Sequence, residues 1–194
     1  LKENPKVPYR NIKHFVYELS GKGPQFWIAT SRGAIAASAE RDSEFNYVEV
    51  YNISNSKILS DNIISIAVGK RQLRWFGTDK GVSAVYGDKW LIPEYQRDYP
   101  EEKFRYFPIT VMATAIHGDT VYVGTEGGGV ARFFRNDVDG ISGASEYAQW
   151  GPIAMPSDSV YSICIAKDGT QWIGTNRGVA RHIGNNTIEN WKVF

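Results

Sequence analysis

One short phrase occurs four times in this sequence, and it constrains the fold more than any other feature. The copies align without gaps as QFWIATSRGAIAAS from Gln25, LRWFGTDKGVSAVY from Leu73, TVYVGTEGGGVARF from Thr120 and TQWIGTNRGVARHI from Thr170. Each copy has an aromatic residue, here called the anchor, at Trp27, Trp75, Tyr122 or Trp172. Successive anchors are 48, 47 and 50 residues apart. This is the period of β-propeller blades, so the sequence predicts a repeat protein of that class.

Each repeat predicts four antiparallel strands. Short apolar runs precede the anchor strands, third strands follow them, and more polar fourth strands complete the units. The fourth strands are expected at 46–52, 89–95, 146–151 and 187–193. The fold class is therefore an all-β propeller of four repeats, a single domain over 1–194 with blades at about 12–52, 62–98, 109–150 and 159–194. Nineteen Gly, eleven Tyr, nine Phe and six Trp agree with a β-rich chain.

The repeat leaves the closure of the propeller open. We expect a compact four-bladed domain, at the lower limit of known propellers. The alternatives are an arc, or half, of a larger propeller and a homodimer that pairs two copies through their terminal blades.

The shared residues of the phrase have structural explanations. Each anchor fills space between sheets, and a threonine three residues later can bond to the turn that follows it. Six residues after the anchor stands a glycine suited to positive φ: Gly33, Gly81, Gly128 and Gly178. We therefore expect ligand-binding residues where the copies differ. In a propeller these turns share one face, which predicts a mouth carrying Arg32, Lys80, Glu126 and Arg177.

A second set of ligand-binding candidates lies in the longest insertion, between 90 and 108. Its aromatic rings, interspersed with Arg and Glu, suit stacking on sugar faces or contact with a protein partner. The alternative is that some of the rings cap the core. The candidates are Trp90, Tyr95, Tyr99 and Tyr106.

Two of the repeats resemble a known family. SDSVYSICIAKDGTQWIGTNRGVAR from Ser157 and SDNIISIAVGKRQLRWFGTDKGVSAV from Ser60 resemble the two-component regulator propeller repeat of bacterial hybrid histidine kinases, many of them glycan-responsive systems of Bacteroidetes. The other copies depart at Ala29 and Tyr122. The resemblance implies a non-enzymatic sensor propeller for two-component signalling, periplasmic or otherwise extracytoplasmic, whose ligand is a carbohydrate or a protein. Secreted and lipid-anchored relatives fit the same pattern.

Two other functions compete with this interpretation. The repeats resemble, more faintly, propeller lyases that inactivate streptogramins, and such a lyase needs a histidine and acidic residues around a metal. His14, His117 and His182 fall at non-equivalent positions, so we expect no metal, no cofactor and no catalytic residues. The other competitor is a structural module for protein–protein assembly.

Charge and hydropathy narrow the partners. Lys plus Arg number 22 against 21 Asp plus Glu, which predicts no nucleic-acid binding. No run of about 18 apolar residues occurs, so no transmembrane segment is expected in this chain. The single cysteine, Cys164, has apolar neighbours and is expected to be buried.

Overall fold

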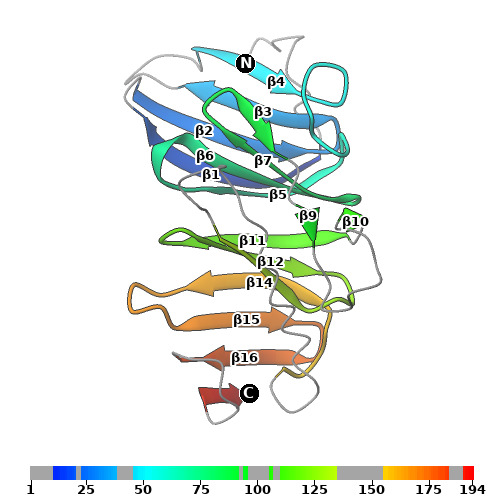
Figure 1. Ribbon diagram of the computed structural model, residues 1–194, viewed down its shortest axis with the longest axis vertical. Helices are drawn as coiled ribbons and strands as arrows, with labels where there is room; N and C mark the ends of the chain where they lie inside the picture. The colour runs from blue at the N-terminus through cyan, green and yellow to red at the C-terminus, as the bar shows by residue number, and fades with distance from the viewer. Residues whose placement is uncertain are drawn as a thin grey trace.

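The computed structural model describes residues 11–20, 23–38, 46–91, 94–95, 105–106, 110–134, 155–183 and 190–194. These residues form four antiparallel blade sheets, one for each repeat, stacked along the long axis of the molecule, and a fifth sheet of two short strands (Figure 1). The predicted all-β propeller architecture is confirmed. Apart from one 3-10 turn at Lys70–Gln72, the described part of the chain contains no helix.

Within each sheet the strands follow one another in sequence order. The first blade contains β1 (Ile12–Ser20), β2 (Gly23–Thr30), β3 (Gly33–Ser38) and β4 (Asn46–Tyr51). The second contains β5 (Ile63–Val68), β6 (Leu73–Thr78), β7 (Gly81–Tyr86) and β8 (Lys89–Leu91). The third contains β11 (Val111–His117), β12 (Thr120–Thr125) and β13 (Val130–Phe134). The fourth contains β14 (Val160–Ile165), β15 (Gln171–Thr175), β16 (Gly178–His182) and β17 (Trp191–Val193).

The prediction is less accurate for the fourth strand of each blade than for the first three strands. The strand expected at 89–95 ends at Leu91, and the segment after it forms β9 (Glu94–Tyr95), which pairs with β10 (Arg105–Tyr106) in a separate sheet. The strand expected at 187–193 is β17, only three residues long. The strand expected at 146–151 lies outside the described residues.

The core lies between consecutive sheets. Successive residues of a strand point to opposite faces, so each anchor faces the following blade and the residue after it faces the preceding blade. Trp27 packs edge-on against Phe76, with ring centroids 5.7 Å apart, and Trp75 lies 5.4 Å from Phe133. Tyr122 packs in the same way in a cluster with Ile173 of the fourth blade.

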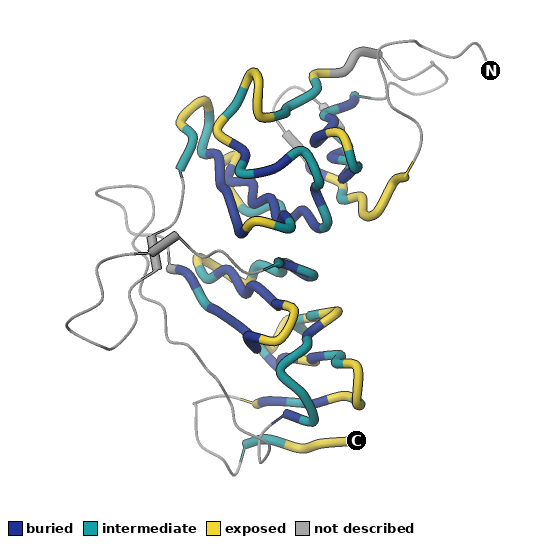
Figure 2. The backbone as a smooth tube through the Cα atoms, turned by 90° about the vertical axis from the view of Figure 1, so that its right-hand side faces the viewer, coloured by how far each residue is buried: buried dark blue, intermediate teal, exposed yellow. Residues whose placement is uncertain are grey.

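The four blades form an open arc rather than a ring. The inner strands β1, β5, β11 and β14 contact one another in that order, and the first and fourth blades lie at opposite ends of the molecule (Figure 1). The expected compact, closed form is therefore wrong, and the alternative of an arc is correct. The repeat specifies a blade and its contact with the next blade, whereas closure depends on the rotation accumulated from blade to blade. Figure 2 shows buried stretches between the sheets and an exposed last strand at the C-terminal end.

Cys164 also differs from expectation. Its side chain is exposed because it lies opposite Trp172 on the outer face of the fourth blade, which no further sheet covers in this structure. The apolar neighbours that suggested burial belong to the strand itself.

Candidate functional site

The candidate site is the row of turns that join the second and third strands of the blades, which we call the rim. In each turn, the threonine of the repeated phrase makes two hydrogen bonds. Thr30 Oγ1 donates to the Gly33 carbonyl at 2.7 Å and accepts from the Arg32 backbone N–H at 3.0 Å. The second blade repeats this geometry with Thr78, which donates to the Gly81 carbonyl at 2.8 Å and accepts from the Lys80 N–H at 3.0 Å. The threonine hydroxyl therefore fixes the backbone of the turn, since it both donates and accepts a hydrogen bond within it.

In the first and fourth turns, the closing glycine is required by both conformation and space. Gly33 has φ of 117°, and a Cβ there would collide with the Tyr51 carbonyl. Gly178 has φ of 137°, and a Cβ there would lie 2.7 Å from the Phe194 carbonyl oxygen. Residues that carry a side chain rarely adopt such φ values, so these glycines belong to the scaffold.

The third turn is one residue longer than the alignment predicts. Thr125 Oγ1 donates to the carbonyl of Gly129, four residues on, at 2.9 Å. Gly129, with φ of 73°, thus takes the place that the sequence alignment gave to Gly128. A gapless alignment of the four phrases could not place the extra residue, because three glycines stand in a row.

Backbone hydrogen bonds join rim turns to the loops that enter the blades, either the next blade or the same one. Gly33 N–H donates to the Asp61 carbonyl at 2.7 Å, and Gly129 N–H donates to the Asp158 carbonyl at 2.8 Å. Glu126 N–H donates to the Thr110 carbonyl at 3.0 Å. The rim is therefore braced by backbone hydrogen bonds, and the side chains at the tips of its turns remain available.

The four charged candidates lie on this rim with exposed side chains. Arg32, Lys80, Glu126 and Arg177 each occupy a turn between a second and a third strand. The structure thus places them at corresponding turns along the arc, and their convergence around one mouth stays a prediction. Three of them are cations, and the carboxylates at the same turns are those of Glu126 and of Asp79, next to Lys80. Their role in binding stays a prediction.

The aromatic candidates are placed less uniformly. Trp90 is half-buried, with its ring 5.8 Å from Tyr51 and 5.6 Å from Phe76, so it takes part in the core between the first two blades. The backbones of Tyr95 and Tyr106 lie in β9 and β10, which Figure 1 draws on the side of the arc where β15 ends and β16 begins. Tyr99 lies outside the described residues.

Sequence reasoning missed a polar cluster at the rim of the second blade. Asn62 Nδ2 donates to Asp79 Oδ2 at 3.1 Å, and Lys13 of the first blade donates to Asn62 Oδ1. Burial raises the pKa of Asp79, but hydrogen bonding by Ser60 and Asn62 outweighs it, so the pKa lies below its usual value. The signal was the tripeptide Ser-Asp-Asn before the inner strand, which has a counterpart at 157–159 in the fourth blade.

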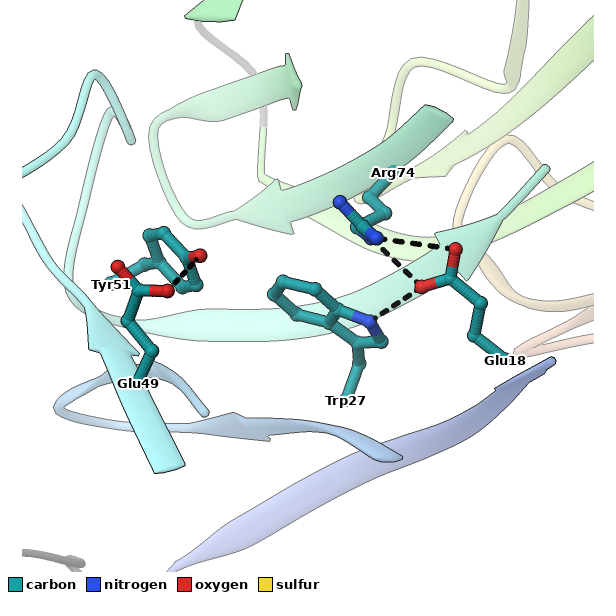
Figure 3. Close-up of polar contacts among 5 residues, drawn as sticks. All are labelled: Glu18, Trp27, Glu49, Tyr51 and Arg74. Carbon is teal, nitrogen blue, oxygen red and sulfur yellow. Dashed lines mark hydrogen bonds and ion pairs between the residues drawn. The ribbon is translucent and has the colours of Figure 1, made fainter. Parts of the chain in front are cut away.

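At the other end of the same strands lies a buried ion pair that stabilises the scaffold. Glu18 of β1 accepts hydrogen bonds from Arg74 Nε and from Trp27 Nε1, both at 2.8 Å (Figure 3). Arg74 also lies over the Trp27 ring, 4.7 Å from its centroid. Tyr51, nearby, donates to Glu49 at 2.5 Å; burial and then this carboxylate raise the Tyr51 pKa. The Glu18–Arg74 pair joins the first two blades.

The three histidines do not converge. His14 Nδ1 accepts a hydrogen bond from the Ile66 N–H at 3.3 Å, and burial lowers its pKa. His117 ends β11, and His182 is buried with its ring stacked on Trp191 at 4.4 Å. Within the described ranges, no three His, Cys, Asp or Glu side chains gather closely enough to share a metal ion.

The comparison with known protein families detects the same repeat. Residues 154–177, from the loop before β14 to the rim turn of the fourth blade, match the family model described as "Two component regulator propeller". The fourth blade carries a two-component regulator propeller repeat. The match ends at Arg177, so this propeller repeat includes the inner strand, the anchor strand and the rim residues of its blade. No curated protein sequence matches the chain at a significant level.

Solved structures share the fold of this propeller-repeat chain. The extracellular domain of a putative hybrid two-component system from Bacteroides thetaiotaomicron superposes with a TM-score of 0.63 at 21% identity, over 94% of this chain and 23% of that one. PorZ, a surface component of the type-IX secretion system of Porphyromonas gingivalis, gives 0.61 at 20% identity over 86% and 25%. Virginiamycin B lyase from Staphylococcus aureus gives 0.52 at 13% identity over 95% and 57%. The chain spans less than a quarter of the Bacteroides domain, so the likeness concerns a group of blades.

No membrane-spanning helix occurs in the part of the chain that the structure describes. The similar Bacteroides structures are extracellular domains.

Proposed function

We propose that this chain is a non-enzymatic, ligand-binding part of a sensor propeller that acts outside the cytoplasm in two-component signalling. The observation that carries the proposal is the rim: four charged side chains, at positions where the repeats differ, project from turns that backbone hydrogen bonds hold in place. The propeller repeat and the Bacteroides domains support the sensor role.

The charges of the rim favour an anionic, hydroxyl-rich ligand. Arg32, Lys80 and Arg177 supply three cations against two carboxylates, Glu126 and Asp79, and the Asp79 carboxylate is already hydrogen-bonded by Asn62. Guanidinium and ammonium groups bind carboxylates and sulfates through charge-assisted hydrogen bonds. A carbohydrate that bears acidic groups matches this chemistry, and the tyrosines of the insertion could stack on its sugar faces. We therefore propose an acidic oligosaccharide as the ligand.

A lyase activity has weaker support. The virginiamycin lyase shares the fold at 13% identity, which carries no catalytic residue over to this chain. The histidines that such a mechanism requires lie in three different blades, and two of them already have contacts within the scaffold.

Titration of the purified chain with acidic and neutral oligosaccharides in a calorimeter tests the proposal. We expect binding of the acidic series only, and about tenfold weaker affinity for Arg32→Ala, Lys80→Ala or Arg177→Ala, since each removes one charge-assisted contact. Lys89→Ala is the matched control, because this exposed cation is the first residue of β8, next to the turn at the opposite end of β7 from the rim.

The insertion needs its own variants. Tyr99→Ala and Tyr106→Ala should weaken binding of the same oligosaccharide if the tyrosines stack on it. Equal affinity of the rim variants and wild type would contradict the rim as the site. Binding of neutral sugars alone, or turnover of a streptogramin, would contradict the proposed ligand or the non-enzymatic role.

A further inference from the structure

Adjacent blades make the same kind of contact at the internal interfaces, and each end of the arc carries only one half of this contact. At an internal interface, the first residue of an inner strand lies against the preceding blade, at the small residue two positions after the anchor. A Cβ at Gly124 would lie only 2.6 Å from Val160 Cγ1, and a Cβ at Gly77 would collide with Val111 Cγ1. The small residue is therefore a socket, and the β-branched side chain of the next blade fills it.

The fourth blade has an empty socket. Around Gly174, the residue equivalent to Gly77 and Gly124, the three atoms nearest to an added Cβ all belong to Ser162 of the same blade, and none belongs to a following blade. The side chains that border the socket are exposed as a result. Trp172 is 39% exposed, against 8% or less for the other three anchors, and Val179 is 38% exposed, whereas its equivalents Val82 and Val130 are 3% exposed or less.

The first blade carries the other half of this contact, the projecting first residue of its inner strand, and no blade among the described residues receives it. Ile12 pairs with Thr30 as Ile63, Val111 and Val160 pair with the threonines of their blades. Those three residues are completely buried, but Ile12 is 54% exposed. Phe15 and Tyr17, further along β1, are 66% and 49% exposed on the same blade. One end of the chain thus presents the projecting side chains, and the other end presents the socket.

We propose that a second copy of this chain binds head to tail, so that Ile12 of each copy fills the Gly174 socket of the other. Both halves of the blade-to-blade contact occur on one polypeptide, and the new contact would continue an interface already formed three times within the chain. Two such contacts close a twofold ring of eight blades, a number within the range of known propellers. The apolar area at the two ends, which would otherwise face water, becomes buried. This inference goes beyond the proposed function and does not depend on it.

Sedimentation equilibrium of the 194-residue chain tests the pairing. We expect a mass twice the 21.8 kDa of the monomer. Ile12→Asp and Val179→Asp each place a carboxylate in the contact, and each should weaken association by about 100-fold. Ile53→Asp is the matched control, because Ile53 is 60% exposed but lies in the loop between β4 and β5; it should remain dimeric.

Mixing the two variants distinguishes head-to-tail pairing from other arrangements. An Ile12→Asp chain retains an intact socket end, and a Val179→Asp chain retains an intact projecting end, so an equimolar mixture should form a 1:1 dimer that neither variant forms alone. Cys164, on the socket face, should react with a maleimide more slowly in the wild-type dimer than in either variant.

Three results would overturn the proposal. A monomer at every concentration would mean that the end faces are covered by something other than a second copy. Dimers that persist in both variants would place the contact elsewhere, and an open series of larger species would exclude a closed pair. Circular dichroism of each variant shows whether the fold survives; where an aspartate variant unfolds, Ile12→Ala and Val179→Ala provide the same comparison.

Discussion

Arg74 of β6 donates two hydrogen bonds to the carboxylate of Glu18 in β1, at 2.8 and 3.2 Å, and this buried ion pair joins the first blade to the second. Glu18 is 5% exposed, and Trp27 donates to the same carboxylate. Removing one member would leave a charge or a donor buried without its partner.

Glu18→Ala should therefore lower the free energy of unfolding by about 3 kcal/mol, the usual result of leaving one charge of a buried pair uncompensated. Urea denaturation followed by tryptophan fluorescence measures the loss. Glu49→Ala, which removes an exposed carboxylate from the same blade, should cost less than about 1 kcal/mol. A double variant, Glu18→Leu with Arg74→Leu, should recover much of the stability, and equal losses for Glu18→Ala and Glu49→Ala would contradict the assignment.

The turn threonines should differ in importance according to their burial. Thr78 is fully buried and makes two hydrogen bonds, so Thr78→Val, which keeps the shape, should cost about 2 kcal/mol by leaving the Lys80 N–H without its acceptor. The same change at Thr175, which is only half-buried at the uncovered end of the arc, should cost less. Thermal melts of the two variants provide the comparison, and a larger shift for Thr175→Val would contradict it.

Gly33 and Gly87 separate backbone conformation from steric overlap. Both have positive φ, at 117° and 56°, but a Cβ at Gly87 would meet nothing within 4 Å, whereas at Gly33 it would collide with the Tyr51 carbonyl. Gly87→Ala should cost about 1 kcal/mol from conformation alone. Gly33→Ala should cost several times as much, or prevent folding of the first blade. Similar losses in chemical denaturation would show that the Tyr51 contact has no effect.

The lowered pKa of Asp79 predicts that the stability of the fold depends on pH. Its pKa in the folded protein lies below the ordinary value of 3.8, so the ionised carboxylate stabilises the fold above that pH, and the stabilisation is lost as pH falls through the folded pKa. Asp79→Asn should thus be less stable than wild type at pH 7, by about 1 kcal/mol, with the difference shrinking below pH 3.8. Melting curves from pH 2 to 7 test this. Asp88→Asn, at an exposed turn, is the control, and a difference that grows toward acid would reverse the inferred sign.

Most of the blade interior could be predicted from sequence because it depends on local chemistry. The anchor, the threonine and the turn glycine each follow from contacts within a few residues, and the first three strands of each blade lie close to where the apolar runs place them. The exceptions are informative. Gly129 replaces Gly128 because hydrogen bonding, rather than spacing, selects the glycine that closes the third turn. β8 ends at Leu91 because the residues after it pair with β10 instead.

The surroundings of the candidate site were less predictable. The rim positions of Arg32, Lys80, Glu126 and Arg177 follow from propeller geometry, and the structure agrees with them. Cys164 and Trp172 are exposed because burial there depends on a neighbouring sheet, which no local pattern encodes. The Asp79 cluster draws its partners from the loop before β5 and from β1, and its contact with Lys13 of β1 forms only once two blades have packed together.

The order in which the blades contact one another also determines how the molecule should open. Because each sheet packs chiefly on its sequence neighbours, the chain approximates a one-dimensional array whose two outermost units have half the support of the inner ones. In the monomeric chain, amide protons of the second and third blades should then be replaced by deuterium only through rare, cooperative openings, whereas those of the first and fourth blades exchange through fraying from either end.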